Sequence, residues 1–153
     1  MPLCAYAQGV PLSSDSYPKG DVMNSSLKQK TQADYQEAVN RVIEAAQANL
    51  AEDWTPQKMA EIALYSKFHF IRVFKEVTGA TPRAYVTRLR LAEAKRLLES
   101  TSRYVTDICL EVGFKHPNNF GASFRRVYGI TPSKCREDAR HQRELAHRQP
   151  VAA

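Results

Sequence analysis

The chain has 153 residues, of which 43% are hydrophobic and 25% charged, so it can fold as one compact domain or as two small subdomains. Its formal net charge is +6, which favours an anionic partner, with nucleic acid ahead of an anionic membrane surface. The three cysteines, Cys4, Cys109 and Cys135, form no C-x-x-C pair, which argues against a disulfide framework or a zinc knuckle and fits a reducing cytoplasm.

The two ends of the chain differ in composition from the middle. Residues 1–33 are rich in Ser, Pro, Gly and Gln and show no sustained hydrophobic period, which predicts a disordered arm. Residues 139–153 are basic and contain Pro150, so we expect a flexible tail. Residues 34–138 carry apolar residues at helical spacing throughout, which predicts an all-α domain of about seven helices.

Helix boundaries inside this domain are well marked. Threonine caps a helix and proline is tolerated at its first position, so three Thr-Pro pairs mark starts: Thr55-Pro56, Thr81-Pro82 and Thr131-Pro132. Ser66 and His116-Pro117 are two further candidate starts. Gly79 and Gly129 are placed to end helices in a left-handed conformation.

An internal repeat organises these helices. The pattern Phe74-x-x-Val77-x-Gly79-x-Thr81-Pro82 recurs fifty residues later as Phe124-x-x-Val127-x-Gly129-x-Thr131-Pro132. Each copy is the end of a helix that buries one stripe, at Phe70, Phe74 and Val77 or at Phe120, Phe124 and Val127, and a shorter helix precedes each. The sequence therefore predicts two helix-turn-helix units, at about residues 56–78 and 104–128.

The helix between the units, residues 82–100, carries two opposed apolar stripes. One consists of Tyr85, Leu89 and Ala92, and the other of Leu91, Ala94 and Leu98. A helix with opposed stripes packs on both sides, so we expect it to join the two units. At 1.5 Å per residue it spans roughly 28 Å, near the ~34 Å between successive major grooves on one face of DNA.

The face of the first unit that is left outside the core has the chemistry of a DNA contact. Arg72 suits guanine O6 and N7, and Phe68 and Ile71 suit thymine methyl groups, so these three residues are predicted to contact bases. Phosphate contacts are expected from Ser66, Lys67 and Lys75. A solvated basic face, with Phe68 folded under a neighbouring loop, is the alternative; the duplication favours DNA.

In the second unit, the predicted base contacts are Asn118, Asn119 and Ala122. Asparagine pairs with adenine, but Ala122 and the neighbouring Gly121 offer no long side chain, so we expect this unit to discriminate less between sequences. The remaining predicted phosphate contacts are Lys115, Arg125 and Arg126, together with Arg83 at the start of the joining helix.

Residues from about 34 to 137 resemble the DNA-binding domain of the AraC/XylS family, and most closely its members that consist of this domain alone. The specific runs are Tyr65–Gly79 followed by Thr81-Pro82-x-x-Tyr85, and Ile108–Phe114 followed by Phe120, Phe124, Gly129 and Thr131-Pro132. The resemblance implies two helix-turn-helix units on a connecting helix, monomeric binding to asymmetric promoter sites, and activation through RNA polymerase. It places Phe68, Ile71, Arg72 and Asn118 at base-contacting positions.

The sequence departs from the family pattern at three positions. Ala122 stands where arginine is common, Leu64 where glycine is common, and Cys135 where tyrosine is frequent. Most members also carry an effector-binding domain before this one. About 33 residues stand in its place here, so we expect no small-molecule effector domain in this chain, unless the chain is the DNA-binding end of a longer protein.

Other function classes lack their sequence features. The four histidines have no metal-ligand spacing, and no phosphate-binding glycine loop or nucleophile motif occurs, so we expect no catalytic residue, metal or cofactor. No apolar run reaches 18 residues, so no membrane partner is expected. The sequence predicts a transcriptional regulator that binds double-stranded DNA at the nucleoid. The alternative is an interaction module that contacts RNA polymerase or another regulator with little DNA specificity.

Overall fold

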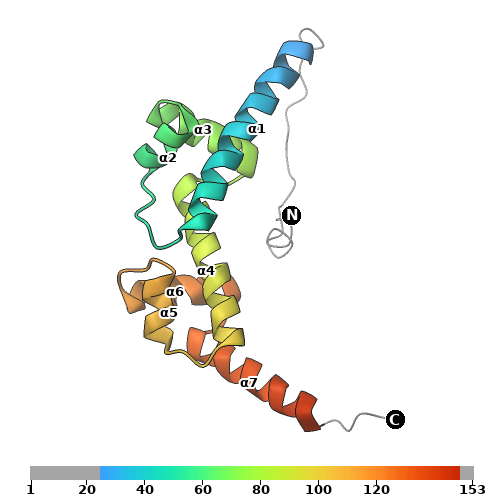
Figure 1. Ribbon diagram of the computed structural model, residues 1–153, viewed down its shortest axis with the longest axis vertical. Helices are drawn as coiled ribbons and strands as arrows, with labels where there is room; N and C mark the ends of the chain where they lie inside the picture. The colour runs from blue at the N-terminus through green and yellow to red at the C-terminus, as the bar shows by residue number, and fades with distance from the viewer. Residues whose placement is uncertain (1–24, 149–153) are drawn as a thin grey trace, which may run out of the picture.

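The computed structural model describes residues 25–148, which form seven α-helices and no strand (Figure 1). This confirms the predicted all-α class. In chain order the helices are α1 (Ser25–Ala48), α2 (Pro56–Ala63), α3 (Lys67–Thr78), α4 (Pro82–Ser100), α5 (Val105–Glu111), α6 (Pro117–Tyr128) and α7 (Pro132–Arg148). Helices α2 and α3 make the first helix-turn-helix unit, and α5 and α6 make the second.

The three Thr-Pro pairs start helices by the expected hydrogen bonds. The Thr55 hydroxyl accepts from the backbone N–H of Lys58 at 3.2 Å, and Thr81 and Thr131 accept in the same way from the residues three positions on. Each bond satisfies an N–H that the first turn of a helix leaves open. Helices α3 and α6 end at Gly79 and Gly129, whose φ values of 74° and 75° are left-handed, as the sequence predicts.

Each unit has its own apolar core, and α4 belongs to both. Val86, Tyr85 and Leu89, in the first half of α4, pack on the core that contains Phe70 and Phe74. The second half of α4 places four buried residues in the core that contains Phe120 and Phe124: Leu91, Ala94, Leu97 and Leu98. The predicted packing of this helix on two sides is thus present, with each unit occupying one half of its length.

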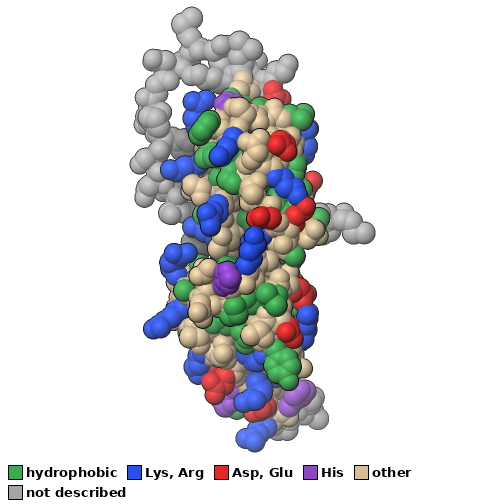
Figure 2. All heavy atoms as spheres, turned by 90° about the vertical axis from the view of Figure 1, so that its left-hand side faces the viewer, with side chains coloured by type: hydrophobic (Ala, Val, Ile, Leu, Met, Phe, Trp, Pro, Cys, Tyr) green, Lys and Arg blue, Asp and Glu red, His purple; other side chains and the backbone are tan. Residues whose placement is uncertain are grey.

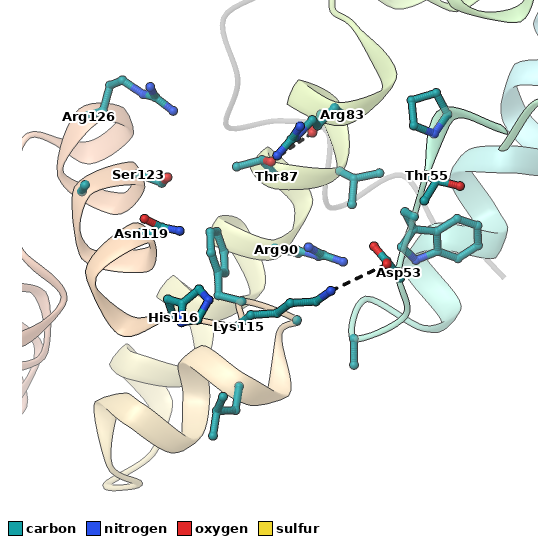
Figure 3. Close-up of a pocket in the computed structure, with 18 residues that line it drawn as sticks. Asp53, Thr55, Arg83, Thr87, Arg90, Lys115, His116, Asn119, Ser123 and Arg126 are labelled. Carbon is teal, nitrogen blue, oxygen red and sulfur yellow. Dashed lines mark hydrogen bonds and ion pairs between the residues drawn. The ribbon is translucent and has the colours of Figure 1, made fainter. Parts of the chain in front are cut away.

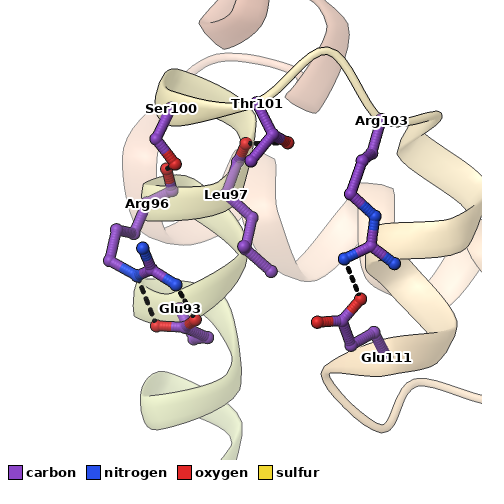
Figure 4. A network of polar contacts seen from close by, with 7 residues as sticks. All are labelled: Glu93, Arg96, Leu97, Ser100, Thr101, Arg103 and Glu111. Carbon is purple, nitrogen blue, oxygen red and sulfur yellow. Dashed lines mark hydrogen bonds and ion pairs between the residues drawn. The ribbon is translucent and has the colours of Figure 1, made fainter.

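The end of α4 is closed by hydroxyl groups rather than by glycine. Ser100 Oγ donates to the carbonyl of Arg96 and Thr101 Oγ1 to that of Leu97, both at 2.7 Å, so carbonyls at the C-terminal end are satisfied (Figure 4). The same view shows an ion pair between Arg103, which precedes α5, and Glu111, the last residue of that helix. These contacts connect the segment between α4 and α5 to both helices.

The helices extend beyond both predicted boundaries. Helix α1 begins at Ser25, inside the predicted disordered arm of residues 1–33, and α7 continues to Arg148, inside the predicted tail of residues 139–153. Residues 25–33 contain no Gly or Pro, and α7 carries ion pairs one turn apart, Lys134–Asp138 at 2.8 Å and Arg140–Glu144 at 4.0 Å. The remainders of the predicted arm and tail, residues 1–24 and 149–153, lie outside the described residues.

The turn of the first unit contains a leucine in a left-handed conformation. Leu64 has φ 60°, and its side chain is 78% exposed. The corresponding residue of the second unit is Gly113, with φ 95°. A side chain at positive φ crowds the backbone, at a cost of roughly 1–2 kcal/mol. The first turn is therefore locally strained.

Replacing Leu64 with glycine is expected to raise the free energy of unfolding by about 1 kcal/mol, because it removes this crowding and little packing is lost. Urea titration followed by circular dichroism measures the change. Leu110→Gly is the matched control, since Leu110 is an exposed leucine within α5, where glycine lowers stability. Equal losses in the two variants would show that Leu64 is unstrained.

Candidate nucleic-acid interface

The two helix-turn-helix units project to the same side of the rod formed by α4, with α1 and α7 extending from its two ends (Figure 1). Figure 2 shows the molecule from that side. Lys and Arg side chains run along its left half, whereas most Asp and Glu side chains lie on the right. One stripe of the face that both units share is therefore suited to an anionic polymer.

Helix α3 presents most of the predicted contact residues to solvent. Phe70, Val73 and Phe74 are its buried residues, which leaves Lys67, Phe68, Arg72 and Lys75 on the exposed face. Phe68 is 82% exposed, and the Lys67 ammonium lies 5.8 Å from the centre of its ring. The alternative, in which Phe68 folds under a neighbouring loop, is thus not seen, and a large exposed aromatic residue among cations is typical of a contact surface.

The outward position predicted for Ile71 is only partly correct. Ile71 is half-buried and packs against the first core, so only part of its side chain lies on the surface. On the inward face, Val73 is buried, whereas Val77 is only half-buried. The buried stripe of α3 is therefore centred on Phe70, Val73 and Phe74, with Ile71 and Val77 at its edges.

His69 is a contact of Arg72 that the sequence analysis missed. Arg72 Nη2 lies 3.2 Å from His69 Nδ1, and because a guanidinium can only donate, the ring nitrogen is the acceptor of this contact. The rings of Tyr65 and Tyr35 meet the imidazole edge to face, with centroids 4.9 and 5.7 Å away. The aromatic contacts hold the imidazole, and the imidazole in turn orients Arg72. This contact could have been predicted from the sequence, because side chains three residues apart on a helix, such as His69 and Arg72, lie side by side.

Helix α6 buries Phe120 and Phe124 and exposes its predicted contact residues, but the predicted burial of Val127 is wrong, since that residue is 47% exposed. These are the predicted base contacts Asn118, Asn119 and Ala122 and the predicted phosphate contacts Arg125 and Arg126. The structure thus brings together an amide pair, one methyl group and two cations on the open face of this helix.

A groove of about 790 Å³ lies between α6 and the loop that precedes α2, with α4 as its floor (Figure 3). We call it the inter-unit groove. It gathers three predicted phosphate contacts, Arg83, Lys115 and Arg126, and a fourth cation, Arg90. Among the described residues that line it, Asp53 is the one carboxylate. The groove is therefore cationic overall.

Three hydroxyl groups in the inter-unit groove were not predicted. Thr55 comes from the start of α2, Thr87 from α4 and Ser123 from α6 (Figure 3). Hydroxyl groups are common partners of phosphate oxygens. Residues this far apart in sequence meet only in the folded chain, and no local pattern marks them. The predicted contact Ser66 lies elsewhere, exposed at the start of α3.

The described residues offer little support for metal binding, thiol chemistry or insertion into a membrane. No group of three or more His, Cys, Asp or Glu side chains within residues 25–148 is placed to hold a metal ion. Cys109 and Cys135 are buried, and burial raises the pKa of both thiols, which keeps them protonated and unreactive. None of the described helices is long and apolar enough to cross a membrane.

Known proteins resemble this chain in both sequence and fold. A family described as a helix-turn-helix domain matches residues 59–138. The transcriptional activator RhaS of Enterobacter sp. is 33% identical over 99 residues, which cover 65% of this chain and 36% of that protein. The chain spans about a third of the length of the first curated relatives that it matches.

Two solved structures share the fold. A transcriptional regulator of Chromobacterium violaceum, described as having an AraC-type DNA-binding domain, has a TM-score of 0.65 and 29% identity, covering 70% of this chain and 96% of that one. The DNA-binding domain of AdpA, a global transcriptional factor solved in complex with a target DNA, has a TM-score of 0.67 and 29% identity at the same coverage.

Proposed function

Because this chain belongs to the AraC/XylS family of helix-turn-helix transcriptional regulators, whose members are not enzymes, we propose that it binds double-stranded DNA at asymmetric promoter sites. In this proposal it binds as a monomer, in the cytoplasm at the nucleoid, and activates transcription through contact with RNA polymerase. The name of RhaS describes an activator, and AdpA was solved with its target DNA; both support the proposal by likeness.

The observation that carries the proposal is the exposed stripe on α3. Phe68, Arg72 and Lys75 share the solvent face of a helix whose other side is anchored in a core. Arg72 would donate two hydrogen bonds to one guanine, and Phe68 would contact a thymine methyl group. The partly exposed Ile71 would contact a base only at its outer edge. Such an array is of little use to a protein that contacts polymerase alone.

The second unit would contact the next major groove on the same DNA face. The 19 residues of α4 span about 28 Å, close to the ~34 Å that separates successive grooves, so one chain suffices without a partner. Asn118 and Asn119 would pair with adenine, whereas Ala122 offers one methyl group. We therefore propose that the first unit supplies most of the sequence discrimination.

The inter-unit groove would hold the DNA backbone between the two major grooves. Arg83, Lys115 and Arg126 approach it from three elements, and the hydroxyl groups of Thr55 and Ser123 add hydrogen-bond donors, whereas that of Thr87 donates to the Arg83 carbonyl at 2.9 Å. Ser66, Lys67, Lys75 and Arg125 would contact phosphates beside the recognition helices. Such contacts supply affinity on any sequence and fix the position of the protein on the duplex.

Selection from a pool of random duplexes tests the proposal. The full chain should enrich a two-part sequence whose halves lie about one helical turn apart, with the sharper half assigned to α3. A reporter gene with the enriched site upstream of a weak promoter then tests activation. Absence of any enriched sequence would contradict DNA recognition and would favour the interaction module.

Replacing Lys75 with alanine should weaken binding to all sequences by a similar factor, because a phosphate contact carries no base information. The slope of log K against log salt concentration should fall by about 1, since one fewer counterion is released. Fluorescence anisotropy at several salt concentrations measures both. Arg41→Ala, which removes an exposed cation of α1, should leave the slope unchanged. A loss confined to one sequence would mean that Lys75 contacts a base.

A further inference from the structure

A single side chain on α4 connects the loop of the first unit to the helix between the units. Arg90 Nε donates to the carbonyl of Leu50 at 2.9 Å, and its Nη2 donates to the carbonyl of Glu52 at 2.7 Å. Both carbonyls belong to the segment between α1 and α2. Arg90 is half-buried there, and burial lowers the pKa of its guanidinium, an effect that the nearby Asp53 partly offsets. The guanidinium stays charged, so both hydrogen bonds are charge-assisted.

The turn of the second unit meets the same point. Gly113 approaches so closely that a Cβ atom there would lie 2.6 Å from the Leu50 carbonyl oxygen and 2.9 Å from Arg90 Cζ and Nε. Its φ of 95° also favours glycine. Three elements, the loop before α2, the helix α4 and the turn before α6, therefore converge on Arg90. We call this point the junction.

A second contact between the units lies at the surface. Lys115 reaches from the second unit toward Asp53 of the first, at 3.7 Å (Figure 3). Both side chains are more than 70% exposed, and exposed ion pairs of this kind contribute little to stability. Apart from the shared helix α4, the connection between the units therefore depends mainly on Arg90 and on the close approach of Gly113.

The junction stands apart from the two cores. Each core is an apolar cluster with its own aromatic residues, and Arg90 lies between the two clusters. A connecting helix by itself leaves the units free to bend or twist relative to each other. The contacts at the junction lie beside the axis of α4 and restrict both motions, because the units are then attached to each other at two points, α4 and the junction. The guanidinium hydrogen bonds thus fix the orientation of one unit relative to the other, in addition to any effect on the stability of either unit.

We propose that Arg90 is a positioning residue that presets the separation and relative rotation of α3 and α6, and so restricts binding to one spacing between the two halves of a DNA site. This inference rests on the proposed function. Each added base pair moves one half-site by about 3.4 Å and rotates it by about a tenth of a turn. A fixed pair of recognition helices fits one such arrangement, and fixing it in advance lowers the entropic cost of binding.

The test uses the full chain and the enriched duplex, with one base pair inserted or removed between its halves. The wild-type protein should lose affinity for the altered duplexes by about tenfold or more, as for a mismatched base pair. Arg90→Ala should bind the original duplex less well, and its loss on the altered duplexes should shrink to about threefold or less. Asp53→Asn removes the exposed ion pair and the one carboxylate among the described residues of the groove, so it should bind every duplex somewhat more tightly, while the ratio of its affinities for the original and altered duplexes should stay that of the wild type.

Binding to a duplex that carries only the α3 half-site separates the outcomes. If Arg90→Ala binds the half-site as the wild type does and keeps the wild-type spacing preference, the inference is overturned while the proposed function stands. If the wild-type protein enriches no sequence, the proposed function itself fails. Arg90→Lys serves if Arg90→Ala does not fold, because lysine keeps the charge but cannot form the planar pair of hydrogen bonds.

A measurement without DNA checks the geometry directly. Spin labels on exposed residues Glu76 of α3 and Val127 of α6, in a chain whose Cys4 is replaced by serine, report the distance between the helices. The distance distribution should be narrow in the otherwise wild-type protein and at least twice as wide with Arg90→Ala or Arg90→Lys. Equal widths would contradict a positioning role for Arg90, whatever the result of the selection.

Discussion

Replacing Gly113 with alanine is expected to lower the free energy of unfolding by about 2–5 kcal/mol. The positive φ accounts for roughly 1–2 kcal/mol of this, because an L side chain crowds the backbone there. The remainder, roughly 1–3 kcal/mol, comes from a Cβ forced to within 2.6 Å of the Leu50 carbonyl oxygen, which the junction can relieve only by moving backbone. Urea titration, followed by circular dichroism and by the fluorescence of Trp54, measures the loss.

Two glycines serve as matched controls for this variant. Gly129 has a similar left-handed φ of 75°, but a Cβ there would enter space that the described residues leave open, so alanine should cost only the backbone strain. Gly121 lies within α6, also beside open space, and alanine there should raise stability by up to about 1 kcal/mol. If Gly113→Ala costs no more than Gly129→Ala, the close approach at the junction does not constrain the fold.

Replacing Arg72 with alanine should weaken binding to the enriched duplex by about 1–3 kcal/mol and relax the preference at one base position. The reason is that two directed hydrogen bonds to guanine are lost. Neither an apolar contact nor a phosphate contact distinguishes guanine from the other bases in the same way. Selection repeated with the variant, together with anisotropy on duplexes altered at each position, measures both effects. The relaxed position should lie in the half assigned to α3.

Two further variants show whether the Arg72 effect comes from base recognition. Arg72→Lys keeps the charge but loses the planar donor pair, so it should also relax the same position. Arg125→Ala on α6 should weaken binding without changing the selected sequence. If Arg72→Ala weakens all sequences equally, then Arg72 contacts phosphate and the specificity of the first unit lies elsewhere.

The helices could be predicted where their boundaries depend on local chemistry. Thr55, Thr81 and Thr131 cap their helices through a neighbour three residues away, and Gly79 and Gly129 supply a backbone conformation of their own. The contact faces of α3 and α6 followed from their phenylalanines, because whatever lies opposite a buried stripe is exposed. The two ends were harder, since polar helices such as the outer part of α7 carry no hydrophobic period.

The junction could not be predicted, because its partners are distant in sequence. Arg90 meets the Leu50 carbonyl across 40 residues, and the bond uses a backbone acceptor that every residue possesses. The sequence shows that residue 113 is a glycine, but it does not show that the Leu50 carbonyl and the Arg90 side chain lie close to it. The same limit applies to the inter-unit groove, where hydroxyl groups from α2, α4 and α6 meet. The pairing of His69 with Arg72 was within reach of sequence reasoning, since both lie on one helix face.

The division of α4 between two cores has a consequence for folding. Each unit needs α4 as one of its walls, so a chain cut after α4 would leave Leu91, Ala94 and Leu98 uncovered, and a chain cut before it would leave Phe70 and Phe74 without their neighbour Val86. Neither half is a self-sufficient module. The two units are therefore expected to fold and unfold together. A partly folded molecule in which only one unit could bind DNA is disfavoured.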